Sequence, residues 1–354
     1  KINTYLFNLT NKYIFINFLI ISIFILFINL LELSRIIEED NKNIINFFYF
    51  SLLKYPSILN EIIPFVIIVS VTFLIRNLIS NNEFVSMRNL GYSIFDIFKP
   101  IGIAIFILGV FFLFFINPLA VFLETMYDKK LDNNDNSLYS IKISNNEMWI
   151  KNEIDQKNSS FINIKNINLR NMDATNIKIL IISDGSNKFI MAQNGEFKDN
   201  LFILNNVKFY DFQKDTYSNL DNYNLVTNFN NDNLISSISK YKLVPFYKYL
   251  NHSKTLLKFN LYSSEIGLYY LSEILKPIFI VVLAFVILGF TTKFKRNENF
   301  FKVLFVAISV GFLIFLLKEV ITKLTISLSL NFILSYFIIF LIPLFVGLYQ
   351  IIKI

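Results

Sequence analysis

The sequence predicts an α-helical membrane protein with six transmembrane helices and an exported, antiparallel, jelly-roll-like β domain between helices 3 and 4. Three observations predict this fold class. The chain of 354 residues is 54% apolar, its strongly apolar residues gather in six uncharged runs, and a long polar segment separates the third run from the fourth. The predicted domains are residues 1–124 (helices 1–3), 125–265 (the β domain) and 266–354 (helices 4–6).

The six apolar runs cover residues 13–31, 62–75, 100–123, 277–292, 303–317 and 324–352. A helix needs about 20 residues to cross the roughly 30 Å hydrocarbon core. The first, third and sixth runs reach this length alone. The others need polar flanks such as Arg76, Lys276 and Lys318, whose charged ends can extend to the interface. A cleaved signal peptide is the alternative for the first run, but that run is too long and no small-residue cleavage site follows it.

The net charge of +7 follows membrane topology, which argues against a nucleic-acid-binding protein. If the N-terminus is cytoplasmic, the inner segments carry a large excess of Lys and Arg, whereas acidic residues nearly balance the basic ones in the short outer loops. The positive-inside rule then predicts both termini in the cytoplasm and the middle segment in the periplasm, with the chain in a bacterial inner membrane. The chain has no Cys and a single His, so a disulfide, a thiol site or a metal site built from His and Cys is not expected.

The polar segment predicts short strands at residues 161–167, 177–182, 188–192, 201–204 and 207–212, because these runs are rich in β-branched and aromatic residues. Turn dipeptides separate them at Asp184-Gly185, Asn194-Gly195 and Asn205-Asn206. Residues 211–239 predict an irregular connection or an edge strand, and residues 246–261 predict a basic amphipathic segment that leads into the fourth span.

Residues 82–91, after the second span, predict a short amphipathic helix. Asn81 or Asn82 is its expected N-cap, Glu83 suits the positive end of the helix, and Gly91 ends it. A helix of this kind lies on the membrane or docks into a groove on a soluble partner, and the sequence leaves both open.

Two further patterns occur in and after this helix. Phe84, Met87 and Leu90 are spaced to share one of its faces. Ser93 and Asp96 predict a capping box that opens a further helix, which Pro100 is expected to end.

These elements resemble the lipopolysaccharide export permease family, LptF/LptG. The resemblance rests on Pro56 and Pro64 in the second span, and then on the run Asn82-Glu83-Phe84-x-x-Met87-Arg88-x-x-Gly91-Tyr92-Ser93. Further matches follow in order at Met148-Trp149-Ile150-Lys151, Phe161-Ile162-Asn163-Ile164, Phe246-Tyr247-Lys248-Tyr249-Leu250 and Tyr269-x7-Pro277. The match covers nearly the whole chain and leans toward the LptG side of the pair.

The resemblance implies a permease subunit of an ATP-driven transporter that extracts lipopolysaccharide from the inner membrane and passes it to a periplasmic jelly-roll bridge. It implies a homologous permease subunit as heterodimer partner and a cytoplasmic ATPase dimer that holds ATP and Mg. No catalytic residue and no cofactor are expected in this chain, which has no P-loop motif.

By resemblance, the 82–91 helix is the coupling helix to that ATPase. Its implied contact residues are Glu83, Phe84, Met87, Arg88 and Gly91. The simpler alternative for Glu83 is an acid that merely stabilises the start of the helix.

Four residues are candidates for the substrate path. Arg35 and Lys54 are basic residues at the outer ends of spans, where they could attract lipid phosphates or simply anchor helices. Glu273 and Lys276 predict a pair that lines the pore or anchors the fourth span at the interface. Acidic residues stand at Glu32, Glu38 and Glu39, where the family often has basic ones, so the usual phosphate contacts are not all present.

Three other classes of protein remain as alternatives. The first is a permease of another lipid or of a lipoprotein exporter. Permeases of the lipoprotein-releasing kind have four spans and an exported domain after the first, so the position of the exported segment argues against that kind. A membrane enzyme acting on a lipid-linked sugar would need a cluster of acids or His at one interface. A non-catalytic membrane scaffold would associate with no ATPase.

Overall fold

A computed structural model describes residues 1–36, 44–132, 139–144, 147–155, 158–168, 171–183, 186–198, 200–229, 234, 240–258, 262–328 and 330–352. The chain divides into two compact units. One is helical and comprises Lys1–Tyr127 and Ser263–Ile354, and the other comprises Asp128–Tyr262 and holds the sheet. The two units are described separately below.

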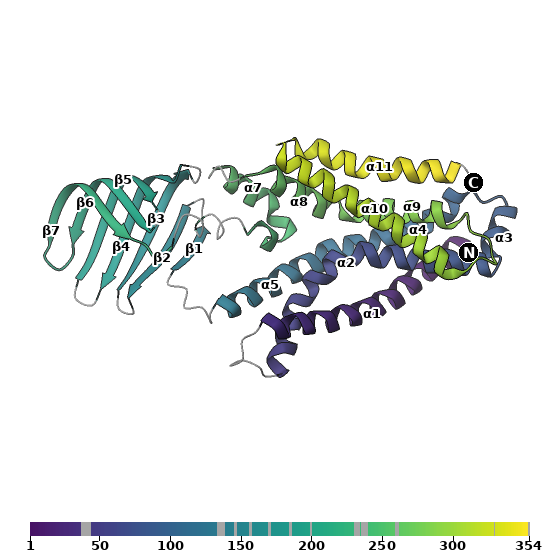
Figure 1. Cartoon of the computed structure of the whole chain (residues 1–354). Coiled ribbons are helices and arrows are strands. Elements are labelled where there is room, and N and C mark those ends of the chain that lie inside the picture. The colour runs from purple at the N-terminus through teal and green to yellow at the C-terminus, as the bar shows by residue number, and fades with distance from the viewer. Residues whose placement is uncertain are drawn as a thin grey trace. The chain divides into compact units, whose positions relative to one another are not determined.

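The helical unit is an assembly of long apolar helices (Figure 1). Its elements are α1 (Ile2–Ile36), α2 (Ile44–Ser80), α3 (Glu83–Asn89), α4 (Ile94–Phe111), the π-helical segment η2 (Phe112–Ile116), α5 (Asn117–Asp132), α8 (Ser264–Ile274), α9 (Lys276–Thr291), α10 (Phe300–Ser327) and α11 (Phe332–Ile352). Among the described residues, five helices are long and apolar enough to cross a membrane, or six if α8 and α9, bent by 70°, form one broken span. The six predicted spans are therefore confirmed when the broken pair is counted as one.

The boundaries of three predicted helices were wrong. The helix that opens at Ser93 does not end at Pro100 but continues through it to Phe111. Pro100 is the seventh residue of α4, where it removes one backbone hydrogen bond without ending the helix. Lys318 and Glu319 do not end the fifth span, because α10 runs on to Ser327, and the sixth span begins at Phe332. Charged residues within α10 were mistaken for a helix end.

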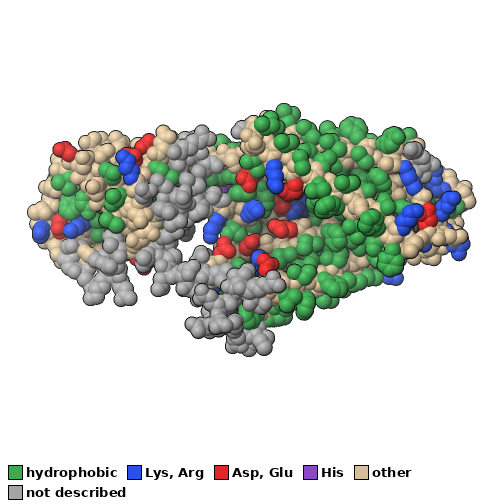
Figure 2. Space-filling view, in the orientation of Figure 1, with side chains coloured by type: hydrophobic (Ala, Val, Ile, Leu, Met, Phe, Trp, Pro, Cys, Tyr) green, Lys and Arg blue, Asp and Glu red, His purple; other side chains and the backbone are tan. Residues whose placement is uncertain are grey.

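The exposed surface of the helical unit matches a membrane environment. Figure 2 shows hydrophobic side chains covering the middle of this unit, with charged side chains gathered toward its ends. Phe24 and Phe27 of α1, Phe305 of α10 and Phe345 of α11 are each at least 60% exposed. Side chains of this kind are compatible with lipid and not with water.

One end of the helical unit holds both termini and α3, as Figure 1 shows. We call this the termini end. The opposite end, where the chain leaves for the other unit after α5 and returns before α8, we call the linker end.

The second unit contains a seven-stranded antiparallel sheet among its described residues, with the strands in simple sequence order. The strands are β1 (Tyr139–Ser144), β2 (Glu147–Asp155), β3 (Asn158–Asn168), β4 (Asp173–Ser183), β5 (Ser186–Lys198), β6 (Leu201–Asp211) and β7 (Thr216–Val226). The antiparallel β domain between the third and fourth spans is confirmed. The order is that of a meander, in which each strand pairs with its neighbour in sequence.

The sheet curls far enough for its second strand to contact the end of its last strand. Asn152 of β2 is completely buried. Its side-chain amide donates to the carbonyl of Val226 at 3.2 Å, and its side-chain oxygen accepts from the backbone N–H of Asn228 at 2.9 Å. The segment that leaves the last strand is thereby held to the second. Since the apolar face lies inside this curl, Phe197 and Phe202 stack there with ring centroids 3.8 Å apart.

A crease crosses the sheet where the alternation of buried and exposed residues breaks. In β3 to β6, two consecutive exposed residues separate buried ones, at residues 165–166, 175–176, 193–194 and 205–206. These pairs are aligned by the strand register. Asn176 and Asn206 adopt left-handed backbone conformations, with φ of 56° and 55°, which Asn tolerates better than most residues.

This crease explains two wrong turn predictions. Asn194-Gly195 lies inside β5 and Asn205-Asn206 lies inside β6, so residues 201–204 and 207–212 belong to one strand as far as Asp211. The dipeptides provide a bend within strands and not a reversal between them. Asp184-Gly185 lies outside the described residues, between β4 and β5.

Short helices follow the sheet. Residues 216–226 form the edge strand β7, one of the two expected outcomes for that segment. After it come the 3-10 helices η3 (Tyr241–Leu243) and η4 (Phe246–Lys248) and the helix α7 (Tyr249–Lys258). In α7, Tyr249 and Leu256 are buried while Leu250 and Leu257 are exposed, so the predicted amphipathic segment is a helix.

The crease generates a prediction about stability. Asn206→Val places a β-branched residue at positive φ and should destabilise the sheet by about 1–2 kcal/mol, which lowers its Tm by several degrees. Trp149, the only tryptophan, lies in β2 and gives a fluorescence signal specific to this unit. Asn205→Val is the matched control, because the neighbouring Asn205 is equally exposed but has ordinary φ. Equal melting of both variants would contradict the role of the left-handed residue.

Candidate functional site

The short helix α3 is held at both ends by local backbone interactions. It starts at Glu83 after Asn82, which occupies the N-cap position with φ of 61° but makes no side-chain capping bond. It ends at a Schellman motif, in which the Gly91 N–H donates to the Arg88 carbonyl at 3.0 Å and the Tyr92 N–H donates to the Met87 carbonyl at 3.1 Å. Gly91 has φ of +89°, so the predicted glycine stop is confirmed.

The helix that follows α3 begins with the predicted capping box. The Ser93 side chain accepts from the Asp96 N–H at 3.1 Å, and the Asp96 carboxylate accepts from the Ser93 N–H at 2.9 Å. A Schellman motif and a capping box thus enclose the turn between α3 and α4. This turn fixes the direction of α3 relative to the membrane helices.

The two faces of α3 differ in what they offer. Phe84 and Met87 are only 7% and 6% exposed, and they pack into the core of the helical unit. Val85 is 51% exposed and Leu90 is 71% exposed. The expectation that Phe84, Met87 and Leu90 share one face is wrong for Leu90, because the helix ends at Asn89. Phe84 and Met87 hold α3 in place, and the accessible apolar side chains are Val85 and Leu90.

Glu83 contacts the first helix. The Tyr5 hydroxyl donates to its carboxylate at 2.8 Å, which joins the start of α1 to the start of α3. Arg88 of α3 is exposed. The termini end therefore presents an acid and a base on a helix that is attached to α1, α2 and α4.

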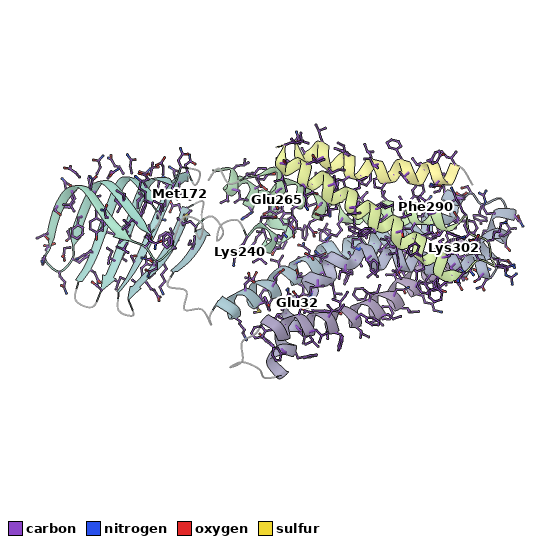
Figure 3. The ribbon with its side chains drawn as sticks, viewed as in Figure 1. Glu32, Met172, Lys240, Glu265, Phe290 and Lys302 are labelled. Atoms are coloured by element: carbon purple, nitrogen blue, oxygen red, sulfur yellow. The ribbon has the colours of Figure 1, made fainter. Side chains whose placement is uncertain are left out.

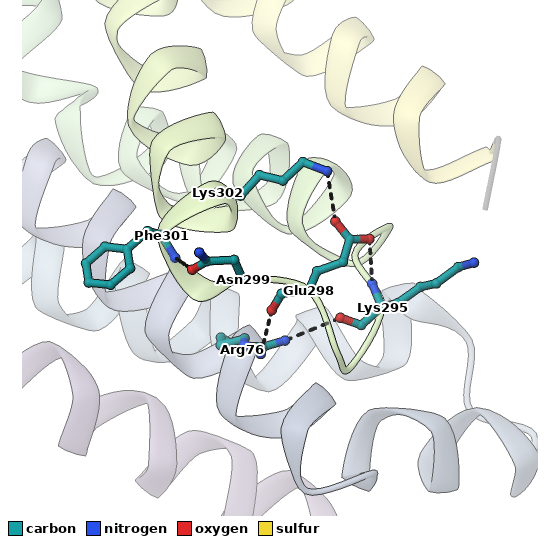
Figure 4. Close-up of polar contacts among 6 residues, drawn as sticks. All are labelled: Arg76, Lys295, Glu298, Asn299, Phe301 and Lys302. Carbon is teal, nitrogen blue, oxygen red and sulfur yellow. Dashed lines mark hydrogen bonds and ion pairs between the residues drawn. The ribbon is translucent and has the colours of Figure 1, made fainter.

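A second polar contact at the termini end joins α2 to the loop between α9 and α10. The Arg76 guanidinium donates to the carbonyl of Glu298 at 2.9 Å and to that of Lys295 at 3.4 Å (Figure 4). The backbone N–H of Lys295 donates to the Glu298 carboxylate and lowers its pKa, helped by the Lys302 side chain. Arg76 therefore fixes the loop between α9 and α10, which the Glu298 side chain also stabilises from within.

A buried charged cluster lies toward the opposite end of the spans. The Lys276 Nζ lies 2.5 Å from Glu273 Oε1, and both side chains are largely buried. Glu273 Oε2 accepts from the side-chain amides of Asn60 at 3.1 Å and Asn117 at 3.3 Å. The predicted Glu273–Lys276 pair is thus formed, and α2 and α5 each supply an amide to its carboxylate.

Pro64 explains why Lys276 also reaches α2. A proline has no N–H, so in a helix the carbonyl four residues earlier loses its partner. Here that carbonyl belongs to Asn60, and it accepts from Lys276 Nζ at 3.3 Å. The ammonium group therefore neutralises a carboxylate and satisfies a backbone group that the proline leaves open.

Two more backbone irregularities occur at the same depth. The π-helical turn η2 immediately precedes Asn117, and the 70° bend between α8 and α9 lies at Leu275, between Glu273 and Lys276. A Cβ added at Gly109 would lie 2.7 Å from Cα of Pro277, so α4 and the start of α9 touch through a glycine. Irregular turns of this kind are frequent at functional positions in helices.

The depth of the cluster follows from helix geometry. At 1.5 Å per residue, Asn60, Asn117 and Lys276 lie about 23–35 Å along their helices from the termini end. A hydrocarbon core is roughly 30 Å thick. The cluster therefore lies near the linker-side limit of a hydrocarbon core that starts at the termini end.

Tyr336 and Lys318 border this cluster. Tyr336 of α11 is 4% exposed, and its hydroxyl has no hydrogen-bond partner in the part of the chain that the structure describes. Lys318 of α10 lies within the electrostatic influence of Lys276, Glu273, Glu319 and Glu61. The charged residues of α10 thus extend the polar region away from the pair.

The other candidates for the substrate path lie on α1 and α2. Lys54 Nζ is 3.9 Å from the Glu32 carboxylate and 6.0 Å from the Tyr127 ring centroid. Glu32 lies at the linker end of α1, whereas Lys302 lies at the termini end (Figure 3). The Arg35 side chain lies outside the described residues. Among those that are described, no group of three or more acidic, His or Cys side chains could hold a metal ion.

Comparison with known proteins agrees with this architecture. The family model described as "Lipopolysaccharide export system permease LptF/LptG" matches residues 4–353. The chain belongs to this family. A comparison with curated proteins gave no match.

Membership of the LptF/LptG family defines the chemistry of this chain. The permease is a transmembrane subunit of a lipopolysaccharide exporter and is not itself catalytic.

Sequence reasoning missed Asn60, Asn117 and Tyr5. Asparagine is abundant throughout the chain, so single amides carried little information. A signal was nevertheless present, because Asn60 stands four residues before Pro64 and Asn117 stands directly before Pro118. An amide next to a proline-opened turn inside an apolar span indicates a polar contact between helices.

The Arg76 contact generates a prediction at the termini end. Arg76→Ala should raise amide hydrogen exchange in residues 293–299 by about tenfold, because two hydrogen bonds from a charged donor are lost. Lys302→Met is the matched control, since it removes an exposed ion pair of small worth. Unchanged exchange in the Arg76 variant would show that the loop is fixed by other contacts.

Proposed function

We propose that this permease couples lipopolysaccharide extraction to a separate cytoplasmic ATPase dimer through α3. The supporting observation is the division of α3 into a buried and an exposed face. Phe84 and Met87 anchor the helix in the core, so a force applied to Val85, Arg88 or Leu90 reaches α2 and α4. In this proposal Glu83 and Arg88 are the charged contacts, Val85 and Leu90 are the apolar ones, and Gly91 ends the helix at the required position.

The location of the protein follows from the same proposal. The termini end, with Arg88, Lys293, Lys295, Arg296 and Lys302, faces the cytoplasm of a bacterial cell, and the sheet unit is periplasmic. The excess of basic residues at the termini end supports this orientation. The membrane is the inner membrane, and ATP and Mg belong to the ATPase.

The substrate path in this proposal runs past the outer ends of α1 and α2. Arg35 and Lys54 attract the phosphates of lipid A, and a homologous permease subunit supplies the other wall. Lys54 can exchange its partner Glu32 for a lipid phosphate, because Glu32 is 3.9 Å away and exposed. Glu273 and Lys276 are buried inside this chain, so they do not line the path. They shape it by positioning α8.

The partners at the periplasmic side are also part of the proposal. The sheet unit passes the lipid to a bridge protein built from jelly-rolls. The subunit is of the LptG type, as the order of motifs suggests. Its expected heterodimer partner is then of the LptF type, and co-purification followed by identification of the partner chain would decide this point.

A charge reversal tests the coupling helix. Glu83→Lys should abolish association with the ATPase and ATP-driven transport while membrane insertion stays intact, because an acidic contact becomes repulsive. Leu90→Asp should have a similar effect through the apolar contact. Tyr5→Phe is the control, since it removes only the intrachain partner of Glu83. Normal ATPase co-purification with Glu83→Lys would refute the assignment.

A pair of substitutions tests the substrate path. Lys54→Gln should reduce photocrosslinking of lipopolysaccharide to α1 and α2 several-fold, because a cation that attracts phosphate is lost. Glu32→Gln should leave crosslinking unchanged or raise it, since it frees Lys54 from its partner. A loss of crosslinking in Glu32→Gln that equals the loss in Lys54→Gln would instead indicate that the ion pair anchors the helices.

A further inference from the structure

The break in the fourth span separates two helices that are held very differently. Nearly all of α9 is buried, with Ile280, Ala284 and Leu288 completely so. Helix α8, on the other side of the break, leads directly to Ser263 and the boundary with the sheet unit. Helix α8 packs against α10 and α11, whereas α9 is enclosed by α2, α4, α10 and α11. A movement that starts at the break would therefore carry α8 past α10 and α11 and leave α9 in place.

The backbone at the break is already open. Leu275 is both the C-cap of α8 and the N-cap of α9. Pro277 has no N–H, so the carbonyl of Glu273 cannot receive the helical bond from four residues ahead. The bend can therefore change at this point without breaking a continuous ladder of hydrogen bonds.

Contacts among three residues hold the bend at its present angle. Lys276 Nζ joins Glu273, on α8, to the carbonyl of Asn60, on α2. The Asn60 amide returns a bond to the Glu273 carboxylate. These three residues close a ring of contacts that crosses the break and ends on the turn that Pro64 opens. We call this ring the latch (Asn60, Glu273 and Lys276).

We propose that the latch ties the C-terminal end of α8 to α2, and that its release lets α8 swing about Leu275 while α9 stays fixed. Asn60 and Lys276 are then positioning residues, because they set the angle of α8 and need not touch the transported lipid. The latch is independent of the proposed coupling helix and of the proposed substrate path.

Distance measurements on the whole chain in lipid nanodiscs test the latch. The chain has no Cys, so spin labels attach only at introduced positions. Leu52→Cys on α2 and Ser264→Cys on α8 form the reporting pair. Asn81→Cys and Asn297→Cys, both at exposed positions of the termini end, form the reference pair. Pulsed electron paramagnetic resonance gives the distribution of distances between the two labels of each pair. The measurement needs no partner protein and no lipid substrate.

The decisive variant combines Glu273→Gln with Lys276→Met. It leaves no unpaired buried charge, so it should fold, but it removes the ammonium from the Asn60 carbonyl. We expect the reporting pair to gain a longer distance, with the ratio of open to closed shifted by about tenfold, and the reference pair to stay unchanged. Lys276→Arg should keep the closed distance because a guanidinium can reach both acceptors. Lys54→Met removes a cation from an exposed pair and should leave both distributions unchanged.

Three outcomes would overturn the latch. An unchanged reporting pair in the double variant would show that packing alone sets the angle of α8. Broadening of both pairs would show that the cluster supports the fold as a whole. An equal shift in Lys54→Met would attribute the effect to the loss of any cation on the linker side.

Discussion

The helical unit depends on the requirement that backbone polar groups within a membrane find partners inside the protein. Lipid offers none, and each unsatisfied group costs several kcal/mol. Three of the spans interrupt their own hydrogen-bond ladders at one depth, at Pro64, at η2 and at Leu275–Pro277. The Asn60 carbonyl, the Glu273 carboxylate and the Lys276 ammonium satisfy one another there. This exchange satisfies the Asn60 carbonyl, which Pro64 leaves without its helical partner.

The same cluster shows how specificity arises in an apolar bundle. Leu, Ile and Phe side chains pack against lipid as well as against each other, so they do not determine which helices become neighbours. A carboxylate that accepts from Asn60 and Asn117 requires α2, α5 and α8 to meet at one height. The close approach of Gly109 to Pro277 adds a steric requirement between α4 and α9.

Much of the fold was predictable because hydrophobic runs and charge asymmetry are strong signals. The six spans, the antiparallel sheet between them, the capping box at Ser93 and the stop at Gly91 follow from patterns of a few residues. The end of the fifth span was misplaced because Lys318 and Glu319 are charged, and a local pattern cannot show that the helix continues past them to Ser327. Asn194-Gly195 was misplaced for a related reason, since a dipeptide that allows a turn equally allows a bend within a strand. At the candidate site, Glu273 and Lys276 were predictable as a pair from their spacing. Their connection to Asn60 joins residues more than 200 positions apart and was not.

The meander order of the sheet has a consequence for how this unit is made. Because every strand pairs with its neighbours in sequence, each new strand can add to the sheet as soon as it emerges from the ribosome or a translocation channel. Chains with such local contacts fold quickly, since little loop-closure entropy is lost at each step. The contact of Asn152 with Val226 and Asn228 must wait for the last strand. Synthesis can therefore build the sheet progressively, and the curl closes at the end.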